Sequence, residues 1–337
     1  MKRANHLFPR IIDPENLRLA FWKAQKGKNG SFYVQRYRQH LYFNLQELAE
    51  HLETGQVQVG QYYVFHIHDP KERLICASSF SEQVLHHALM NICHPYFERK
   101  QIFDSYASRP GKGVHAALNR AQVFTRTYPW YLKLDVRKFF GSIYHPVIKQ
   151  QLKGLFKEEH LLWIFHQIID SYTDASQRGL PIGNLCSQYF ANHYLTGLDH
   201  YLKEVLRIPG YLRYMDDMIL WHTQKQALQK AEKAIHYYVE TKLHQQLKPS
   251  QLNRCKRGVP MLGYRLFPTH RRLSQRSKRR FIRKIHVYKT AWESGHWSED
   301  EYQRRIQALL AFLSHADAAT FQRDVIFDSE GWTSSSS

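Results

Sequence analysis

Two adjacent aspartates stand inside a stretch of the chain that otherwise has the composition of a buried strand. The stretch is RYMDDMIL, residues 213–220, and the pair is Asp216 and Asp217. Neighbouring side chains of a straight strand point to opposite faces, so a strand cannot place both carboxylates on one face. A hairpin turn at Met215-Asp216 would resolve this conflict, because it lifts both acids out of the core. Aspartate is also common in ordinary turns, so the pair alone does not define a site.

A third carboxylate, Asp135, stands near the end of another apolar strand, predicted over 130–136. If the two strands are neighbours, the three acids converge. Carboxylates so close together repel one another unless a cation lies between them, and Mg²⁺ prefers oxygen ligands of this kind. Two such ions, about 3.5–4 Å apart, would stabilise the attacking and leaving oxygens of a phosphoryl transfer.

The charge of the chain favours a polyanionic partner. Its 337 residues contain 48 Lys and Arg against 29 Asp and Glu, a formal net charge of +19. An excess of this size repels itself in a compact fold, and a nucleic acid would neutralise it. A basic protein that is merely soluble is the alternative. The hydrophobic content of 43% indicates a folded chain, long enough for two or three subdomains.

The cysteines are widely spaced and form no CxxC pair, so we expect core residues and not zinc ligands or disulfide partners. They are Cys76, Cys93, Cys186 and Cys255. The N-terminal sequence lacks the apolar run of a signal peptide, and no stretch is long and apolar enough to span a bilayer. We therefore expect no membrane partner and a cytoplasmic location.

Apolar periodicity and turn signals divide the chain into helices and hairpins. A helix is expected to begin at Asp13-Pro14, with proline at its first position. Further helices are predicted over 31–55, 80–98 and 298–316 and after the turns at 104–113 and 179–183; hairpins are predicted over 61–78, 210–222 and 258–268.

Residues 270–289 hold nine Lys or Arg and no acid. On a helix, Phe281, Ile285, Tyr288 and Trp292 share one face, which can pack on the protein, while a basic face can lie along a phosphate backbone. A solvated basic face is the alternative. The basic face comprises Arg276, Arg279, Arg280, Arg283 and Lys284.

Four motifs of the sequence resemble those of the reverse transcriptases. YMDD, LDVRKFFGSI, SYASRPGKGVHAAL and GVPMLGYRLF resemble, respectively, the family signature, its first catalytic block, its fingers-to-palm block and its primer-gripping hairpin. The resemblance covers roughly residues 10 to 290, in family order. GLPIGNLCSQYFANHYL has isoleucine where most of the family has glutamine, and is similar to reverse transcriptases of diversity-generating retroelements.

The resemblance implies an α+β fold shaped as a right hand, with a carboxylate-bearing antiparallel palm sheet and a basic helical thumb. The implied parts are fingers over 1–110 and 146–180, a palm over 111–145 and 181–268, a thumb over 269–330 and a flexible tail over 331–337.

The resemblance also assigns the metal site. Asp135 and Asp216 would hold two Mg²⁺ ions, which Mn²⁺ could replace, with the carbonyl of Val136 helping. Asp217 would complete the metal site beside the primer terminus. A lysine after the hairpin usually donates a proton to pyrophosphate in this family, and here Lys248 and Lys256 are both candidates.

The remaining roles follow the same resemblance. Arg73 would clamp the triphosphate, although the usual partner lysine is replaced in that neighbourhood by His66 or His68. The nucleotide pocket would comprise Arg73, Phe140, Ile182 and Gly183. The primer grip would comprise Met261, Leu262, Gly263 and Tyr264. Arg109 and Lys112 offer a basic loop to nucleic acid, with an ordinary basic turn as the alternative.

Isoleucine at position 182 cannot make the hydrogen bond that a glutamine would make near the nucleotide. Loss of such polar anchoring lowers discrimination between correct and wrong pairs, so we expect relaxed fidelity. A packing substitution without effect on fidelity is the alternative.

The resemblance therefore implies an RNA-directed DNA polymerase, prokaryotic or phage-encoded, that copies a template-repeat RNA with low fidelity at template adenines. Its partners would be template RNA, the RNA–DNA duplex, dNTPs and an oligomeric accessory variability protein. The alternatives are a retron, group II intron-like or defence-associated reverse transcriptase, or a non-catalytic nucleic-acid-binding protein on the same fold.

Overall fold

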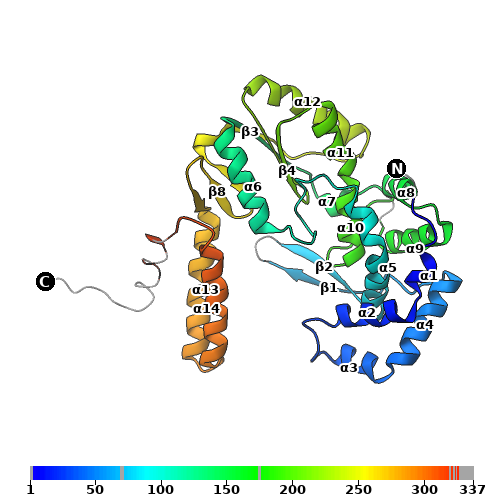
Figure 1. Cartoon of the computed structure of the whole chain (residues 1–337). Helices are drawn as coiled ribbons and strands as arrows, with labels where there is room; N and C mark the ends of the chain where they lie inside the picture. The colour runs from blue at the N-terminus through cyan, green and yellow to red at the C-terminus, as the bar shows by residue number, and fades with distance from the viewer. Residues whose placement is uncertain are drawn as a thin grey trace.

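The computed structural model describes residues 3–68, 72–173 and 176–318, together with 320, 321, 323 and 325. Its strands form three sheets, and helices pack around them (Figure 1). The first half contains α1 (Phe8–Ile11), α2 (Pro14–Ala24), α3 (Phe32–Gln39), α4 (Leu41–Thr54), β1 (Tyr62–Ile67), β2 (Arg73–Ser78), α5 (Phe80–Glu98), α6 (Val114–Thr127), β3 (Trp130–Asp135), α7 (Phe139–Ser142), α8 (His145–Leu155) and α9 (Glu159–Asp170). The second half contains α10 (Leu185–Tyr194), α11 (Thr196–His200), the π-helix η1 (Tyr201–Val205), β4 (Gly210–Tyr214), β5 (Asp217–His222), α12 (Lys225–Thr241), β6 (Gln251–Arg254), the 3₁₀-helix η2 (Cys255–Arg257), β7 (Val259–Met261), β8 (Tyr264–Leu266), β9 (Arg271–Leu273), α13 (Gln275–Glu293) and α14 (Glu299–Leu313).

A four-stranded antiparallel sheet occupies the centre of the molecule, in the order β4-β5-β3-β6. Alternation along β3 sends Leu132 and Leu134 into the larger core and Tyr131 into a second, smaller core. The larger core lies toward α12, whereas the smaller core lies toward α6 and β8. Because both faces are covered, the strands read as nearly continuous apolar runs.

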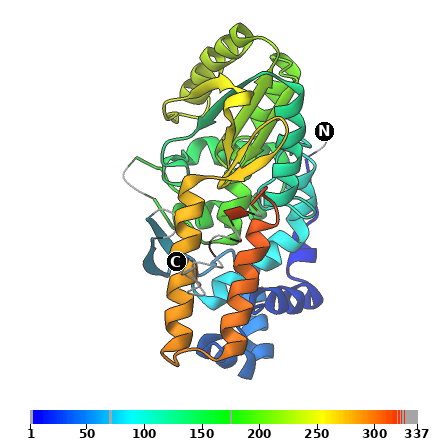
Figure 2. The ribbon, with the colours of Figure 1, turned by 90° about the vertical axis from the view of Figure 1, so that its left-hand side faces the viewer.

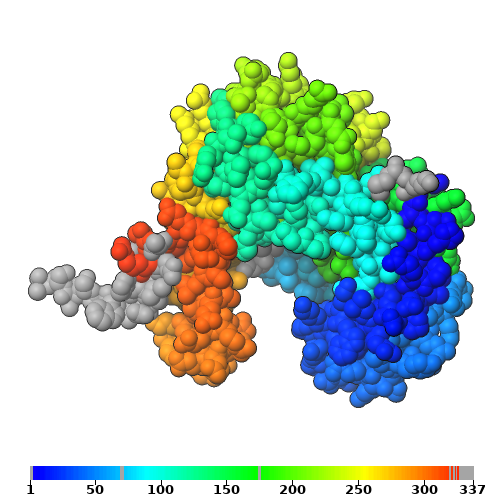
Figure 3. Space-filling view, in the orientation of Figure 1, coloured from blue at the N-terminus to red at the C-terminus, as the bar shows by residue number. Residues whose placement is uncertain are grey.

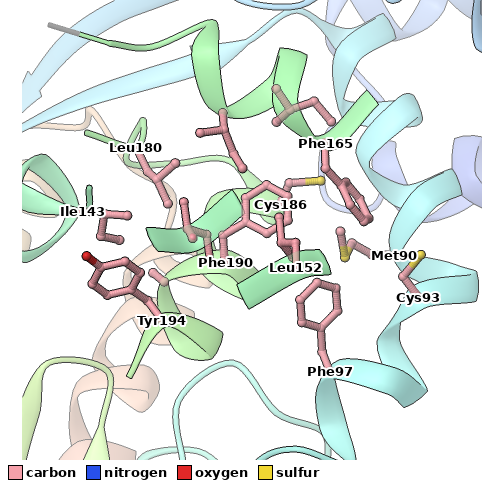
Figure 4. Close-up of a cluster of buried hydrophobic side chains, with 14 of the residues drawn as sticks. Met90, Cys93, Phe97, Ile143, Leu152, Phe165, Leu180, Cys186, Phe190 and Tyr194 are labelled. Atoms are coloured by element: carbon pink, nitrogen blue, oxygen red, sulfur yellow. The ribbon is translucent and has the colours of Figure 1, made fainter. Parts of the chain in front are cut away.

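The larger core joins the N-terminal helices to the helices that follow β3. Figure 4 shows Phe97 of α5, Phe165 of α9 and Phe190 of α10 gathered in it. The rings of Phe165 and Phe190 meet edge to face, with centroids 5.4 Å apart. Helices α1–α5 and the helices α8–α10, which follow β3, therefore share one core.

The predicted hairpin over 61–78 is confirmed, with β1 and β2 antiparallel and Ile67 opposite Arg73. Its predicted turn at Asp69-Pro70 lies outside the described residues. The hairpin is joined to the body of the protein by its second strand, because the amide of Cys76 donates to the carbonyl of Ile182 over 2.9 Å.

The single helix predicted over 31–55 is wrong, because the chain breaks between α3 and α4. His40 adopts φ −117° and ψ 35°, outside the helical region. The side-chain amide of Asn44 donates to the carbonyl of Tyr37 over 2.9 Å and so satisfies an end of α3. The helix predicted to begin at Asp13-Pro14 is confirmed, with the Asp13 carboxylate accepting from two amides of the first turn.

The C-terminal part consists of a small sheet and a pair of long helices. The sheet has the order β7-β8-β9. Because β9, which the sequence did not predict, pairs with β8, the sheet extends across the boundary expected near 269. Helices α13 and α14 lie side by side and extend away from the central sheet (Figure 2). The space-filling view shows an open cleft between this helical pair and the N-terminal helices (Figure 3). Among the described residues, no helix combines the length and apolar content needed to cross a membrane.

All four cysteines are buried and none forms a disulfide, as expected of core residues.

Helix α5 contains a buried acid and a buried histidine one turn apart: the side chains of Glu82 and His86 are 0% and 1% exposed. Glu82 accepts a hydrogen bond from the amide of Gly60 over 3.1 Å. Burial raises the pKa of Glu82 to about 7 and lowers the pKa of His86 to about 3.

We expect Glu82→Gln to change how stability depends on pH. A carboxyl whose folded pKa is raised stabilises the fold below its unfolded pKa of about 4.3. This contribution is lost as the pH rises through about 7. The wild type should therefore lose free energy of unfolding relative to Glu82→Gln between about pH 5 and pH 8, as measured by urea unfolding. Glu240→Gln, at an exposed position, is the control and should follow the wild type. The expectation is contradicted if the free energy of unfolding depends on pH in the same way in the wild type and in Glu82→Gln.

Candidate active site

The two central aspartates lie at a tight turn, as predicted. Tyr214 pairs with Asp217, so Met215 and Asp216 form a two-residue connection between β4 and β5. Met215 adopts φ +54°, a left-handed conformation that side chains other than glycine seldom occupy. Strain of this kind persists only where the surrounding structure fixes the backbone.

The three carboxylates converge at one end of the sheet. Asp135 at the end of β3 lies directly opposite Asp217 at the start of β5. Burial, with a smaller contribution from Asp135, raises the pKa of Asp216 to about 6. Burial also raises the pKa of Asp217, although the neighbouring Lys133 opposes the shift.

Two lysines provide the counter-charge. The ammonium of Lys133 donates to Asp217 Oδ2 over 2.6 Å and to the carbonyl of Pro260 over 3.0 Å. The ammonium of Lys248 donates to Asp135 Oδ1 over 2.7 Å. Lys133 thus ties the second aspartate of the turn to the strand β7, and Lys248 is the candidate lysine that reaches the carboxylates.

The carbonyl of Val136 points toward β5. Its two neighbours bond to the opposite side: the amide of Lys248 donates to the carbonyl of Asp135 (2.8 Å), and the amide of Arg137 donates to Gln246 (2.7 Å). Carbonyls alternate in direction along an extended strand, so Val136 directs its own oxygen to the side where Asp217 lies.

The atoms that could bind a metal at this end of the sheet fit a hard divalent cation. They are oxygens only, the ligands that Mg²⁺ prefers. Asp217 Oδ1 is buried and has no hydrogen-bond partner within the described residues. Within the described residues, no three His, Cys, Asp or Glu side chains are arranged so that they could hold a metal ion. At this end of the sheet the ammonium groups of Lys133 and Lys248 contact the carboxylates instead.

A buried ion pair beneath the turn was missed by sequence reasoning. Arg213 and Asp199 are both 0% exposed, with Nη2 and Oδ2 2.7 Å apart. The guanidinium of Arg213 also donates to the carbonyl of Met215 (3.1 Å) and to the side-chain oxygen of Asn192 (3.1 Å). The signal was present in LRYMDD, because an arginine inside an apolar strand needs a buried partner.

The predicted nucleotide-pocket residues come from several elements. Ile182 and Gly183 lie against β2: a side chain at Gly183, where φ is +120°, would meet Ile75 Cγ2 at 3.1 Å. Phe140 is partly exposed beside the buried Phe139. Arg73 begins β2 and is exposed, and within the described residues its guanidinium has no ion-pair partner.

The two histidines considered near the clamp differ in their contacts. His66 Nδ1 lies 3.0 Å from Glu72 Oε1, in an exposed pair. The rings of His66 and His68 stack with centroids 6.2 Å apart. His66 is therefore engaged with an acid of its own hairpin, which makes it a poor substitute for a free lysine.

The hairpin predicted as primer grip is anchored to the helical pair. The side chains of Met261 and Tyr264 are buried, and Leu262 and Gly263 form the turn between β7 and β8. The carbonyl of Gly263 accepts from the hydroxyl of Ser277 (2.7 Å) and from the amide of Ser274 (2.9 Å).

Arg109 is a correction to the expected nucleic-acid-binding set. Its side chain is 8% exposed and pairs with Glu98 at 2.6 Å. It also donates to the carbonyls of Ile102 and Ser105 (2.7 and 2.5 Å), so its donors stabilise the loop. Lys112 donates to the carbonyl of Phe103 over 3.0 Å and lies over that ring.

The basic helix has the two faces that its spacing predicts. Phe281 and Ile285 are buried, whereas Arg276, Arg279 and Arg283 are exposed. Two further members of the basic face are only partly exposed: Arg280, whose guanidinium lies 5.8 Å from the ring centroid of Phe312, and Lys284.

Comparison with known proteins decides the family. The reverse transcriptase (RNA-dependent DNA polymerase) family matches residues 68–266, which include all three aspartates, the turn and the loop at Ile182. The chain belongs to this family. The α+β right-hand polymerase fold predicted from the sequence is thereby confirmed, with the antiparallel sheet carrying the carboxylates.

Among curated proteins, this reverse transcriptase is similar to intron proteins. It is 21% identical to the putative COX1/OXI3 intron 1 protein of Saccharomyces cerevisiae over 173 residues, which are 49% of this chain and 21% of that protein. It is 26% identical to nuclear intron maturase 1, mitochondrial, of Arabidopsis thaliana over 83 residues, 25% of this chain and 12% of that one. The chain thus spans a small part of the length of these relatives.

Among solved structures, apo telomerase from Candida tropicalis matches 71% of this chain and 54% of its own, with 12% identity and a TM-score of 0.49. Telomerase from Candida albicans with a TWJ fragment of telomeric RNA matches 71% of this chain and 52% of its own, with 10% identity and a TM-score of 0.49.

We expect Lys133→Met to slow primer extension by about 10-fold or more, since a hydrogen bond to a charged group contributes about 1.5–3 kcal/mol. The substitution leaves Asp217 close to two other acids without its ammonium partner and releases Pro260 of β7. The KM for primer–template should rise as well, because the hairpin loses an anchor. Steady-state extension kinetics measure both effects. Lys153→Met, at an exposed position of α8, is the control; equal kinetics for the two variants would contradict the assignment.

Proposed function

We propose that this reverse transcriptase copies a template-repeat RNA into cDNA with low fidelity at template adenines, as the polymerase of a diversity-generating retroelement. The observation that carries the polymerase reaction is the convergence of Asp135, Asp216 and Asp217 at one end of the sheet. The subtype rests on the LPIGN loop, with Ile182 in place of glutamine.

In the proposed reaction, a primer 3′-hydroxyl attacks the α-phosphate of a deoxynucleotide and pyrophosphate leaves. Asp135, Asp216 and the carbonyl of Val136 would hold Mg²⁺, with Asp217 beside the primer terminus. Bound there, the ions stabilise the negative charge that develops on the attacking and leaving oxygens. The protein supplies position: the buried Arg213 fixes the turn, and Lys133 orients Asp217.

The surrounding residues would select and hold the nucleotide. Arg73, exposed at the start of β2, is suited to bidentate contact with a triphosphate. Phe140 would exclude a ribose 2′-hydroxyl. Lys248, whose ammonium lies on Asp135, is favoured over Lys256 as the donor of a proton to pyrophosphate.

The fingers, palm and thumb boundaries given by the resemblance are part of this proposal, with one adjustment. Since β9 pairs with β8, the sheet that carries the primer grip extends past 269 to Leu273. The exposed Arg276, Arg279 and Arg283 would follow the phosphates of the RNA–DNA duplex. An accessory variability protein would be a further partner.

A second candidate is an intron-type reverse transcriptase. The similarity to intron proteins of yeast and Arabidopsis favours it. Such an enzyme would copy RNA without errors concentrated at adenines, so the error spectrum separates the two candidates.

We expect primer extension on a defined RNA template, with dNTPs and Mg²⁺, to depend on Asp216. Asp216→Asn should reduce the rate by roughly three orders of magnitude, because a correctly held metal contributes several kcal/mol. Sequencing the wild-type products should show errors concentrated at template adenines. Accurate extension would exclude the diversity-generating subtype and leave the intron-type enzyme. No extension, even with accessory protein and native RNA added, would leave a non-catalytic nucleic-acid-binding protein.

We expect Ile182→Gln to lower the misincorporation frequency at template adenines several-fold, since a side-chain amide restores polar anchoring beside the nucleotide. Ile182→Leu is the matched control, because it keeps an apolar side chain of equal size. Product sequencing measures both. The same error frequency in wild type and Ile182→Gln, or an equal change in Ile182→Leu, would make Ile182 a packing residue only.

A further inference from the structure

The N-terminal helices carry a hollow of about 410 Å³ with an aromatic and basic edge. Its edge, called the rim below, consists of Tyr33 and Arg36 of α3, Phe43 of α4 and His40 between them. Tyr33 is 73% exposed and Phe43 is 65% exposed. Exposed aromatic side chains that gather in one patch are typical of interaction sites.

The floor of the hollow is rigid. It contains the buried rings of Tyr37 and Phe80, which meet edge to face with centroids 5.2 Å apart. Phe21 of α2 packs on both rings from below, at 5.8 Å and 6.1 Å. Asn44, which also lines the hollow, is bonded to Tyr37. The rim therefore stands on a fixed support, and a ligand would not have to order it.

The lining of the hollow is basic, although the acid Glu47 lies near Tyr37. Residues 16–46 contain six Lys or Arg and no Asp or Glu. Within the described residues, the guanidinium of Arg36 makes no hydrogen bond or ion pair, and no acid lines the hollow. An exposed arginine and two exposed aromatic rings around one hollow match the chemistry of a nucleotide, which offers a phosphate beside a flat base.

We propose that the rim binds single-stranded RNA, with an unpaired base stacked on Tyr33 or Phe43 and an adjacent phosphate paired with Arg36. A duplex would not fit this chemistry, because its bases are already stacked on each other. A basic protein partner is disfavoured by the positive charge of the surface. The proposal concerns a site separate from the carboxylates, and it holds for either candidate function.

The position of the hollow agrees with this assignment. Phe80 and Ser81 of its lining begin α5, directly after β2, whose amide at Cys76 bonds to the loop at Ile182. The N-terminal part of the chain faces α13 and α14 across the cleft, and α3 lies at the lower end of this part (Figures 1 and 3). RNA that leaves the cleft on this side can therefore continue along the same basic wall.

The test measures binding of a fluorescent single-stranded RNA that contains 4-thiouridine, by anisotropy and by photo-crosslinking with peptide mapping. All proteins carry Asp216→Asn, so that the result does not depend on polymerase activity. The test variants are Tyr33→Ala with Phe43→Ala, and Arg36→Gln. Tyr42→Ala is the matched control, since Tyr42 is 84% exposed on the same helix as Phe43 but does not line the hollow.

We expect the aromatic double variant to bind the single strand about 10-fold more weakly, in line with the loss of one stacked base. Its crosslinks to peptides of α3 and α4 should disappear, while Tyr42→Ala and duplex RNA binding stay unchanged. Arg36→Gln should weaken binding and reduce its salt dependence. Unchanged melting temperatures show that the variants are folded. Equal affinity for the double variant and Tyr42→Ala, or crosslinks confined to other helices, would overturn the proposal.

Discussion

The buried ion pair between Arg213 and Asp199 is the constraint on which the active-site end of the sheet depends. Two charges out of water are tolerated only when their hydrogen bonds are satisfied, and removal of one partner leaves the other uncompensated. Arg213 satisfies this condition through Asp199 and Asn192 and through the backbone at Met215. Helices α10 and α11, strand β4 and the turn therefore meet at one guanidinium, which fixes where Asp216 lies.

Two lysines balance the charge of the carboxylates above this pair. Lys133 comes from the strand that also carries Asp135, and Lys248 comes from the segment before β6. Three neighbouring acids would otherwise repel one another and loosen the turn. With the lysines in place, the three carboxylates can lie together without a bound ligand. A cation that binds these carboxylates would have to displace the ammonium groups from Asp217 Oδ2 and Asp135 Oδ1.

Much of this arrangement could be predicted from the sequence because it depends on local patterns. The turn at Met215-Asp216 follows from two acids in an apolar run, and the cap at Asp13 follows from its residue type and the proline after it. The break at His40 could not be predicted, since it depends on a contact between Asn44 and Tyr37 that periodicity does not register. Arg109 was misjudged for the same reason: its partner Glu98 becomes its neighbour only once α5 and the loop are folded. The convergence of Asp135 with the turn required β3 and β5 to be neighbours, which the chain order alone leaves open.

The hydrogen bonds from Ser274 and Ser277 to the carbonyl of Gly263 attach the hairpin of β7 and β8 to the start of α13. The connection from η2 into β7 passes through Gly258, where φ is +85° and a side chain would meet Arg265 Cγ at 2.6 Å. The turn at Leu262-Gly263 is therefore held in a fixed position relative to the start of α13. If that turn holds a primer, as proposed, a displacement of α13 by the bound duplex would also displace the primer end.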